Sequence, residues 1–354
     1  MPYRYELELT RKEDGAGFGR REVSPAHLEP AHRQVAFQGQ RRGLVPADPG
    51  NGSVREQPVF HDDDGQISAL TMTVGEGAGR VQRQFGPELF EPAALGWVDQ
   101  LVALGHLEAD SRVEYRVYAL PTHEAHAGDG VTARVRQAAL PLADGRLDEW
   151  LAAAEPVGTI REEDYPVFVT GEVLEQSEAY SGQGRQEEGG AWLVGNLYRQ
   201  TEPRSEIFAV IHTALEARYM AQERFAINPS SQTFLRLSAQ LERRRKRLGR
   251  VGELAMGFYH THPFLPSEVY GHDACTECER REECHLTSAF VSRRDARFFA
   301  ALFGRAPHSV QMVRGLTPVQ AFDLRMFCGD GGGFRQRGYF RLKKNPHPPR
   351  SQPK

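Results

Sequence analysis

ELAMGFYHTHP, residues 253–263, is the stretch that decides the fold of the second half of the chain. Its apolar residues predict a buried β-strand, and Pro263 ends the strand because proline cannot donate to a sheet ladder. Residues i and i+2 of a strand point to the same face, so the imidazoles of His260 and His262 can reach one metal ion. A bare His-x-His pair is more often structural than metal-binding, so further ligands are needed to support a metal site.

Apolar periodicity on both sides of this strand predicts alternating strands and helices. The predicted strands are residues 165–170, 206–218, 309–313 and 321–327. The predicted helices are residues 171–182, 228–249 and 292–304. This alternation predicts an α+β fold in which a mixed sheet is flanked by helices.

A smaller α+β domain is predicted to precede this half, over residues 1–156. Its first 60 residues are rich in Arg, Gly and Pro, and we expect them to be partly disordered. A domain boundary is expected at Pro156, because the residue before a proline is pushed out of the helical region. The proline-rich tail, residues 345–354, is predicted to be disordered.

Composition excludes several classes of protein. The chain has 354 residues, of which 40% are hydrophobic and 26% charged, which is ordinary globular usage. A formal net charge of -3 gives no overall attraction to nucleic acid or to an anionic membrane. No apolar run is long enough for a spanning helix, and the opening MPYRYELELTRKED lacks the apolar region of a signal peptide. We therefore expect a cytoplasmic protein that has no membrane partner.

Further candidate residues could complete a metal site. A catalytic zinc usually has three protein ligands and one open position, and Asp295 of Ser292-x-x-Asp295 could supply the third ligand. The same motif is also a capping box at a helix start, which needs no metal. Glu188 lies where a helix gives way to a strand and could act as a general base, although a solvated acidic turn is the alternative.

Together these motifs resemble the JAB/MPN metallopeptidase family, whose active members carry the JAMM signature. The resemblance covers about residues 160–342 and includes YPVFVTGEVLEQSEAYSG, EEGGAWLVG, FYHTHP and Ser-x-x-Asp. It implies a JAB/MPN-like domain over residues 160–344. By this resemblance His260, His262 and Asp295 would bind a catalytic zinc, Glu188 would take a proton from the attacking water, and Ser292 would stabilise the oxyanion.

The resemblance also implies an activity and a substrate class. Such a protein would be a bacterial-type, deubiquitinase-like zinc hydrolase that cleaves the peptide or isopeptide bond after the C-terminus of a ubiquitin-like protein. Its expected partners are that protein or its conjugates, and ubiquitin-like conjugation enzymes. The N-terminal domain has no predicted role.

One ligand assignment stays open at this point. Family members commonly place the aspartate about eleven residues after the second histidine, whereas Asp295 follows His262 by 33 residues (295 − 262). Asp273 keeps the usual interval, but Tyr270 then occupies the serine position and no amphipathic helix follows. Asp295 is favoured because its motif keeps both the serine and the helix.

The long interval contains a Cys-rich insertion, at about residues 264–290. Within it Cys275, Cys278 and Cys284 offer three thiolates, with His272 or His285 as a fourth ligand. We predict a second, structural zinc here, because metal binding would order a loop of this composition. Free thiols and an iron–sulfur cluster that recruits Cys328 are the alternatives.

Two other functions are compatible with parts of the sequence. One is a catalytically silent MPN-type scaffold or protein-binding module, but the complete set of Glu188, two histidines and Ser-x-x-Asp argues against it. The other is a nucleic-acid-binding factor that uses the Cys-rich insertion and the basic run Arg243–Arg247. That run lies at a predicted helix C-terminus, where cations favour the helix dipole, so nucleic acid is not the expected partner.

Overall fold

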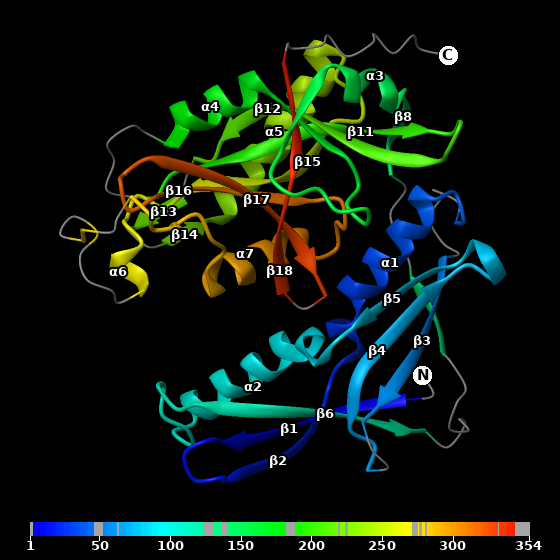
Figure 1. Cartoon of the computed structure of the whole chain (residues 1–354), viewed down its shortest axis with the longest axis vertical. Helices are drawn as coiled ribbons and strands as arrows, with labels where there is room; N and C mark the ends of the chain where they lie inside the picture. Colours follow the sequence, from blue (N-terminus) through cyan, green and yellow to red (C-terminus); the bar gives the residue numbers. More distant parts are fainter. Residues whose placement is uncertain are drawn as a thin grey trace. The chain divides into compact units, whose positions relative to one another are not determined.

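The computed structural model describes residues 3–45, 52–61, 64–122, 131–135, 140–181, 188–218, 220–223, 226–270, 275, 278–279, 282–331 and 333–343. The chain divides into two compact units (Figure 1), residues 1–139 with 330–333 and residues 140–329 with 334–354. Helices and strands are mixed in both units, which confirms the predicted α+β class. The predicted disordered tail, 345–354, lies outside the described residues.

The first unit packs two antiparallel sheets and two helices around one core. The sheet orders are β2-β1-β6 and β5-β4-β3-β7. Apolar side chains from both sheets and from both helices share the core. The elements are β1 (Tyr3–Arg11), β2 (Gly17–Glu22), α1 (Glu29–Arg41), β3 (Gly52–Phe60), β4 (Ile67–Val74), β5 (Val81–Phe85), α2 (Glu91–Ala103), β6 (Val113–Pro121) and β7 (Val131–Val135).

The first 60 residues, expected to be partly disordered, contribute to this core instead. Tyr5, Leu7 and Leu9 of β1 are buried, and so is Val35 of α1. Every second side chain of a strand faces the same side, so the alternating apolar residues of β1 all enter the core. The Arg and Gly residues that suggested disorder lie largely in β2, whose side chains are mostly exposed.

The second unit is built on one large mixed sheet. Its strand order is β18-β17-β16-β15-β11-β12-β10-β19-β9, and β8 pairs with β11. The strands are β8 (Leu142–Asp144), β9 (Ala154–Val157), β10 (Val167–Thr170), β11 (Gly190–Gln200), β12 (Glu206–Glu216), β15 (Leu254–Thr261), β16 (Val310–Leu316), β17 (Phe322–Asp330), β18 (Gly333–Arg337) and β19 (Tyr339–Leu342). A hairpin, β13 (Met220–Glu223) and β14 (Ala226–Pro229), stands apart from this sheet.

The second unit begins earlier than the sequence predicts. Its first residue is Leu140, whereas the expected boundary at Pro156 falls inside β9. The residue before Pro156 is extended, as expected, but it is extended because it belongs to a strand. β9 ends the strand order, and an edge strand tolerates a proline because one side of its backbone needs no ladder hydrogen bond.

Helices cover the sheet and create the apolar packing beside the site. They are α3 (Leu147–Ala152), α4 (Gly171–Ser181), α5 (Ser231–Leu248), α6 (Ser267–Tyr270) and α7 (Arg293–Phe303). Trp192 of β11 and Phe258 of β15 share a core cluster with Leu237 of α5 and with Phe299 and Phe303 of α7. This cluster fixes α7 against the strand that carries the two histidines.

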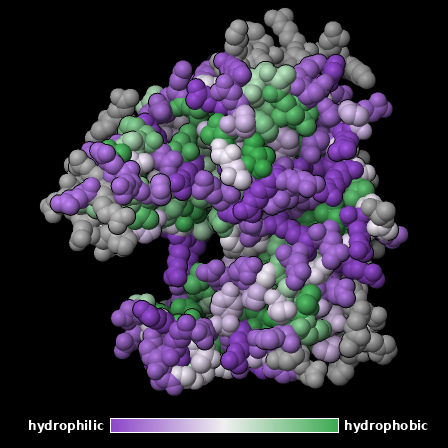
Figure 2. All heavy atoms as spheres, in the orientation of Figure 1, coloured by the Kyte–Doolittle hydropathy of each residue, from purple (hydrophilic) through white to green (hydrophobic). Residues whose placement is uncertain are grey.

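The surface agrees with the ordinary composition of the chain. On the face shown in Figure 2, hydrophilic residues are interspersed with smaller groups of apolar ones. Among the described residues, none of the helices is both long and apolar enough to cross a membrane.

Candidate metal centre

The end of β15 places both histidines and Glu188 on one face of the sheet. β11 pairs antiparallel with β15, with Gly190 opposite His260, so Glu188 comes opposite His262. Thr261 fixes this pairing, because its backbone N–H donates to the Gly189 carbonyl at 3.0 Å and its Oγ1 accepts from the Gly189 N–H at 2.9 Å. The strand register therefore brings a carboxylate from far away in the sequence to the His-x-His motif.

Asp295 reaches the same place from the first turn of α7. Ser292 is the N-cap: its Oγ accepts from the Asp295 N–H at 3.1 Å, and its own N–H donates to Asp295 Oδ2 at 2.8 Å. This reciprocal capping box satisfies two backbone donors at the helix start. The capping role and the proposed ligand role are thus compatible, because the box holds the carboxylate in front of the helix.

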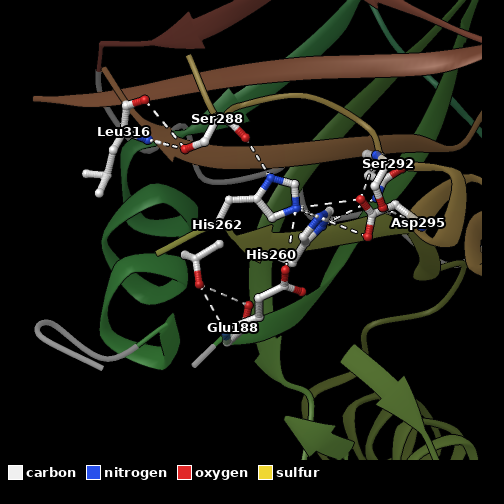
Figure 3. A network of polar contacts seen from close by, with 10 residues as sticks. Glu188, His260, His262, Ser288, Ser292, Asp295 and Leu316 are labelled. Carbon is white, nitrogen blue, oxygen red and sulfur yellow. Dashed lines mark hydrogen bonds and ion pairs between the residues drawn. The ribbon is translucent and has the colours of Figure 1, made fainter. Parts of the chain in front are cut away.

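The three expected zinc ligands lie close together (Figure 3). His260 Nε2 is 3.1 Å from His262 Nε2 and 3.4 Å from Asp295 Oδ1, and His262 Nε2 is 3.5 Å from Asp295 Oδ2. Tetrahedral ligands at zinc-bond length lie roughly 3.3–3.4 Å from one another. The spacing of these atoms therefore fits one tetrahedrally coordinated ion, which need not be zinc.

Burial and charge favour the ionisation states that a metal ion requires. Burial lowers the pKa of His262 below its ordinary value, which favours the neutral ring. Burial alone would raise the pKa of Asp295, but attraction to His260 and hydrogen bonds from both imidazoles outweigh it and hold this pKa well below its ordinary range. A neutral imidazole and an ionised carboxylate are the forms that bind metal.

The two expected catalytic residues lie beside the ligands. Glu188 is 2% exposed, and its Oε1 is 3.7 Å from His262 Nε2. Ser292 uses its oxygen to accept from Asp295 and retains its hydroxyl hydrogen as a donor. The histidine side chains are 2% exposed and Asp295 is 13% exposed, so the site faces solvent on the side of Asp295.

Two residues that the sequence analysis did not single out also contact the histidines. His262 Nδ1 is 2.6 Å from the backbone oxygen of Ser288, and His260 Nδ1 is 3.3 Å from Gln311 Nε2. Ser288 could not have been found from sequence, because its contribution is a carbonyl group that every residue has. Gln311 did carry a signal, since it is the polar residue inside the apolar strand SVQMV.

Gly315 allows Ser288 to approach the site. The Ser288 N–H donates to the Leu316 oxygen at 3.0 Å, and the Leu316 N–H donates to Ser288 Oγ at 2.7 Å. A Cβ at Gly315 would lie 2.2 Å from the Ala289 nitrogen and 2.4 Å from the Ser288 carbonyl carbon. Only glycine at this position leaves room for the segment that contacts His262.

The structure does not gather the cysteines of the insertion. Cys275 is buried, Cys278 and Cys284 are partly exposed, and all three are free thiols. Among the described residues, only His260, His262 and Asp295 form a close group of metal-ligand atoms. His272, a candidate fourth ligand, and Asp273, the alternative to Asp295, lie outside the described residues.

Comparisons with known proteins assign no family to the chain. No family model and no curated protein matches it. Among solved structures, it is similar to the solution structure of protein DSY2949 from Desulfitobacterium hafniense, with 15% identity and a TM-score of 0.31, over 50% of this chain and 94% of that chain. A TM-score this low transfers neither fold nor activity, so the function is inferred from the site itself.

Proposed function

We propose that this protein is a zinc-dependent peptidase of JAB/MPN type that hydrolyses the peptide or isopeptide bond after the C-terminus of a ubiquitin-like protein. The observation that carries the proposal is the spacing of 3.1, 3.4 and 3.5 Å among the ligand atoms of His260, His262 and Asp295. Two nitrogens and one oxygen are a ligand set found in catalytic zinc sites. When bound there, zinc would polarise a carbonyl group and lower the pKa of water.

The protein's own groups would carry the proton and stabilise the developing charge. Glu188 would accept a proton from water as the water oxygen attacks the carbonyl carbon, and would then deliver it to the departing amine. Ser292 would donate its hydroxyl hydrogen to the carbonyl oxygen as that oxygen gains negative charge. Removing one such donor typically costs about 3 kcal/mol of transition-state stabilisation.

The substrate class rests on the resemblance to the JAMM signature alone. The matching residues are Glu188, His260, His262, Ser292 and Asp295. We extend the proposal to ubiquitin-like proteins and to the enzymes that conjugate them, because active members of that family act on such substrates. The cytoplasm is the proposed compartment.

Metal analysis with a cleavage assay tests the proposal. We expect wild-type protein to contain zinc by elemental mass spectrometry, and the double variant His260→Ala/His262→Ala to lose the catalytic zinc and all cleavage of ubiquitin bearing a C-terminal fluorogenic amide. His212→Ala is the matched control, because it removes another largely buried imidazole from β12 of the same sheet. A zinc content unchanged in the double variant contradicts the proposal and favours the scaffold function.

A further inference from the structure

Gln311 is a fully buried polar residue in the middle of β16. Its neighbours Val310, Met312 and Val313 are apolar and buried, and Gln311 itself is 0% exposed. β16 pairs parallel with β15, and Gln311 stands beside Phe258, one same-face position before His260. Burying an amide in an apolar strand costs free energy unless the amide is hydrogen-bonded, so its contact with His260 is significant.

The contact involves the nitrogen of His260 that faces away from the metal centre. Gln311 Nε2 lies 3.3 Å from His260 Nδ1, while His260 Nε2 faces His262 and Asp295. In this orientation the amide would donate to Nδ1, and the ring proton would have to sit on Nε2. A protonated Nε2 cannot bind a metal ion, because its lone pair is used.

Exchanging the amide oxygen and nitrogen removes this conflict. The two ends of a glutamine amide have nearly the same shape, so their assignment follows from the hydrogen bonds they make. Gln311 Oε1 has no hydrogen-bond partner among the described residues in the present orientation. After the exchange it accepts from His260 Nδ1–H, and Nε2 presents its lone pair to the site.

The surroundings of His262 show the same arrangement. His262 Nδ1 lies 2.6 Å from the Ser288 carbonyl oxygen, which can only accept. His262 is therefore held with its proton on Nδ1 and with Nε2 directed at the site. An acceptor at Gln311 would give His260 the same tautomer, as in metal sites where a second layer of groups orients the ligands.

We propose that Gln311 is a positioning residue that accepts a hydrogen bond from His260 Nδ1–H through Oε1 and thereby directs His260 Nε2 to the metal ion. This inference rests on the proposed function, because it concerns a ligand of the same centre. Gln311 contacts neither substrate nor reacting atoms. Its effect is on the affinity for metal and on the position of one proton.

Two substitutions separate an accepting role from a merely structural one. Gln311→Met keeps the approximate size of the side chain but has no strong acceptor, whereas Gln311→Glu keeps acceptor oxygens and loses the donor. Met312→Leu is the matched control, because Met312 is fully buried in the same strand and faces the opposite side of the sheet. The probe is Zn²⁺ alone, titrated in competition with a chromophoric chelator.

We expect Gln311→Met to weaken zinc binding by about 10- to 100-fold, the usual cost of losing a group that orients a metal ligand. Gln311→Glu and Met312→Leu should bind zinc as the wild type does. Equal affinity of Gln311→Met and the wild type overturns the inference while leaving the metal centre intact. Failure of the wild type to bind any zinc contradicts the proposed function instead.

Imidazole ¹⁵N chemical shifts in metal-free protein provide a readout that needs neither zinc nor a folded variant. At a pH where the ring is neutral, we expect His260 of the wild type to carry its proton on Nδ1. Where Gln311→Met folds, the Nε2–H form should gain population, and Gln311→Glu should restore the Nδ1–H form. A proton on Nε2 in the wild type overturns the inference, even if zinc binding cannot be compared among the variants.

Discussion

The metal centre and the Cys-rich insertion both contain ligand-type residues, but the structure arranges them differently. His260, His262 and Asp295 come from β15 and α7, and Asp295 lies 33 residues beyond His262 (295 − 262), yet their ligand atoms form one close group. Cys275, Cys278 and Cys284 are much closer in sequence and form no such group among the described residues. Proximity along the chain and proximity in space are thus reversed.

The difference teaches that regular elements can organise a site before any ion arrives. The strand pairing of β11 with β15 positions Glu188 and the histidines, and the capping box of α7 positions Asp295. The insertion between His262 and Ser292 has only the short helix α6 among its described elements. There a metal ion would itself have to contribute the folding free energy.

The largest effect on turnover is expected from Glu188→Gln. The amide keeps the size of the side chain but cannot take a proton, so we expect turnover to fall by about 10²- to 10⁴-fold. Zinc content should not change, since Glu188 is not among the three grouped ligands. Steady-state cleavage of the fluorogenic substrate and metal analysis on the same preparation measure both quantities.

Glu172→Gln is the control for this substitution, because Glu172 is a glutamate in the first turn of α4 and is exposed. Full activity in Glu188→Gln would contradict the general-base role. Loss of zinc in that variant would instead make Glu188 a metal ligand, and the centre would then have no separate base.

The sequence was sufficient for the parts of the site that depend on local pattern. His-x-His on a strand places two imidazoles on one face, and Ser-x-x-Asp at a helix start orients a carboxylate, because both periodicities are properties of the backbone. The contacts of Ser288 and Gln311 depend instead on which strands lie side by side. No local pattern encodes that pairing, so these contacts required the structure.

The limits of prediction in the first unit have a related cause. Arg and Gly residues suggested disorder before residue 60, but exposed β2 accommodates them while alternate residues of β1 fill the core. Pro156 suggested a domain boundary and proved to lie in an edge strand. Both signals were real local properties whose meaning was set by tertiary position.

An intermediate effect is expected from Gly315→Ala, which tests the link between the insertion and the centre. The added methyl group would overlap backbone atoms of Ser288 and Ala289, which cannot rotate away. We expect the Ser288 carbonyl to move from His262 Nδ1, zinc affinity to fall about tenfold, and the free energy of unfolding to fall by about 1–3 kcal/mol. Chelator competition and urea unfolding measure these two losses.

Gly96→Ala supplies the comparison, since a Cβ at Gly96 in α2 meets nothing within 4 Å. It should leave zinc affinity unchanged and raise stability slightly, as alanine favours a helix. If Gly315→Ala loses stability but binds zinc as tightly as the wild type, then the Ser288 carbonyl does not orient His262.

The smallest effect on turnover is expected from Cys278→Ser/Cys284→Ser. The sequence predicts that these thiolates help hold a structural zinc, so this variant should contain less zinc than the wild type. Its turnover should change little, because the ligands of the centre are held by β15 and α7. Cys328→Ser, in β17, is the control, and iron that disappears with it would indicate a cluster. Unchanged zinc in the double variant would leave free thiols as the interpretation and would make the contrast between the two regions complete.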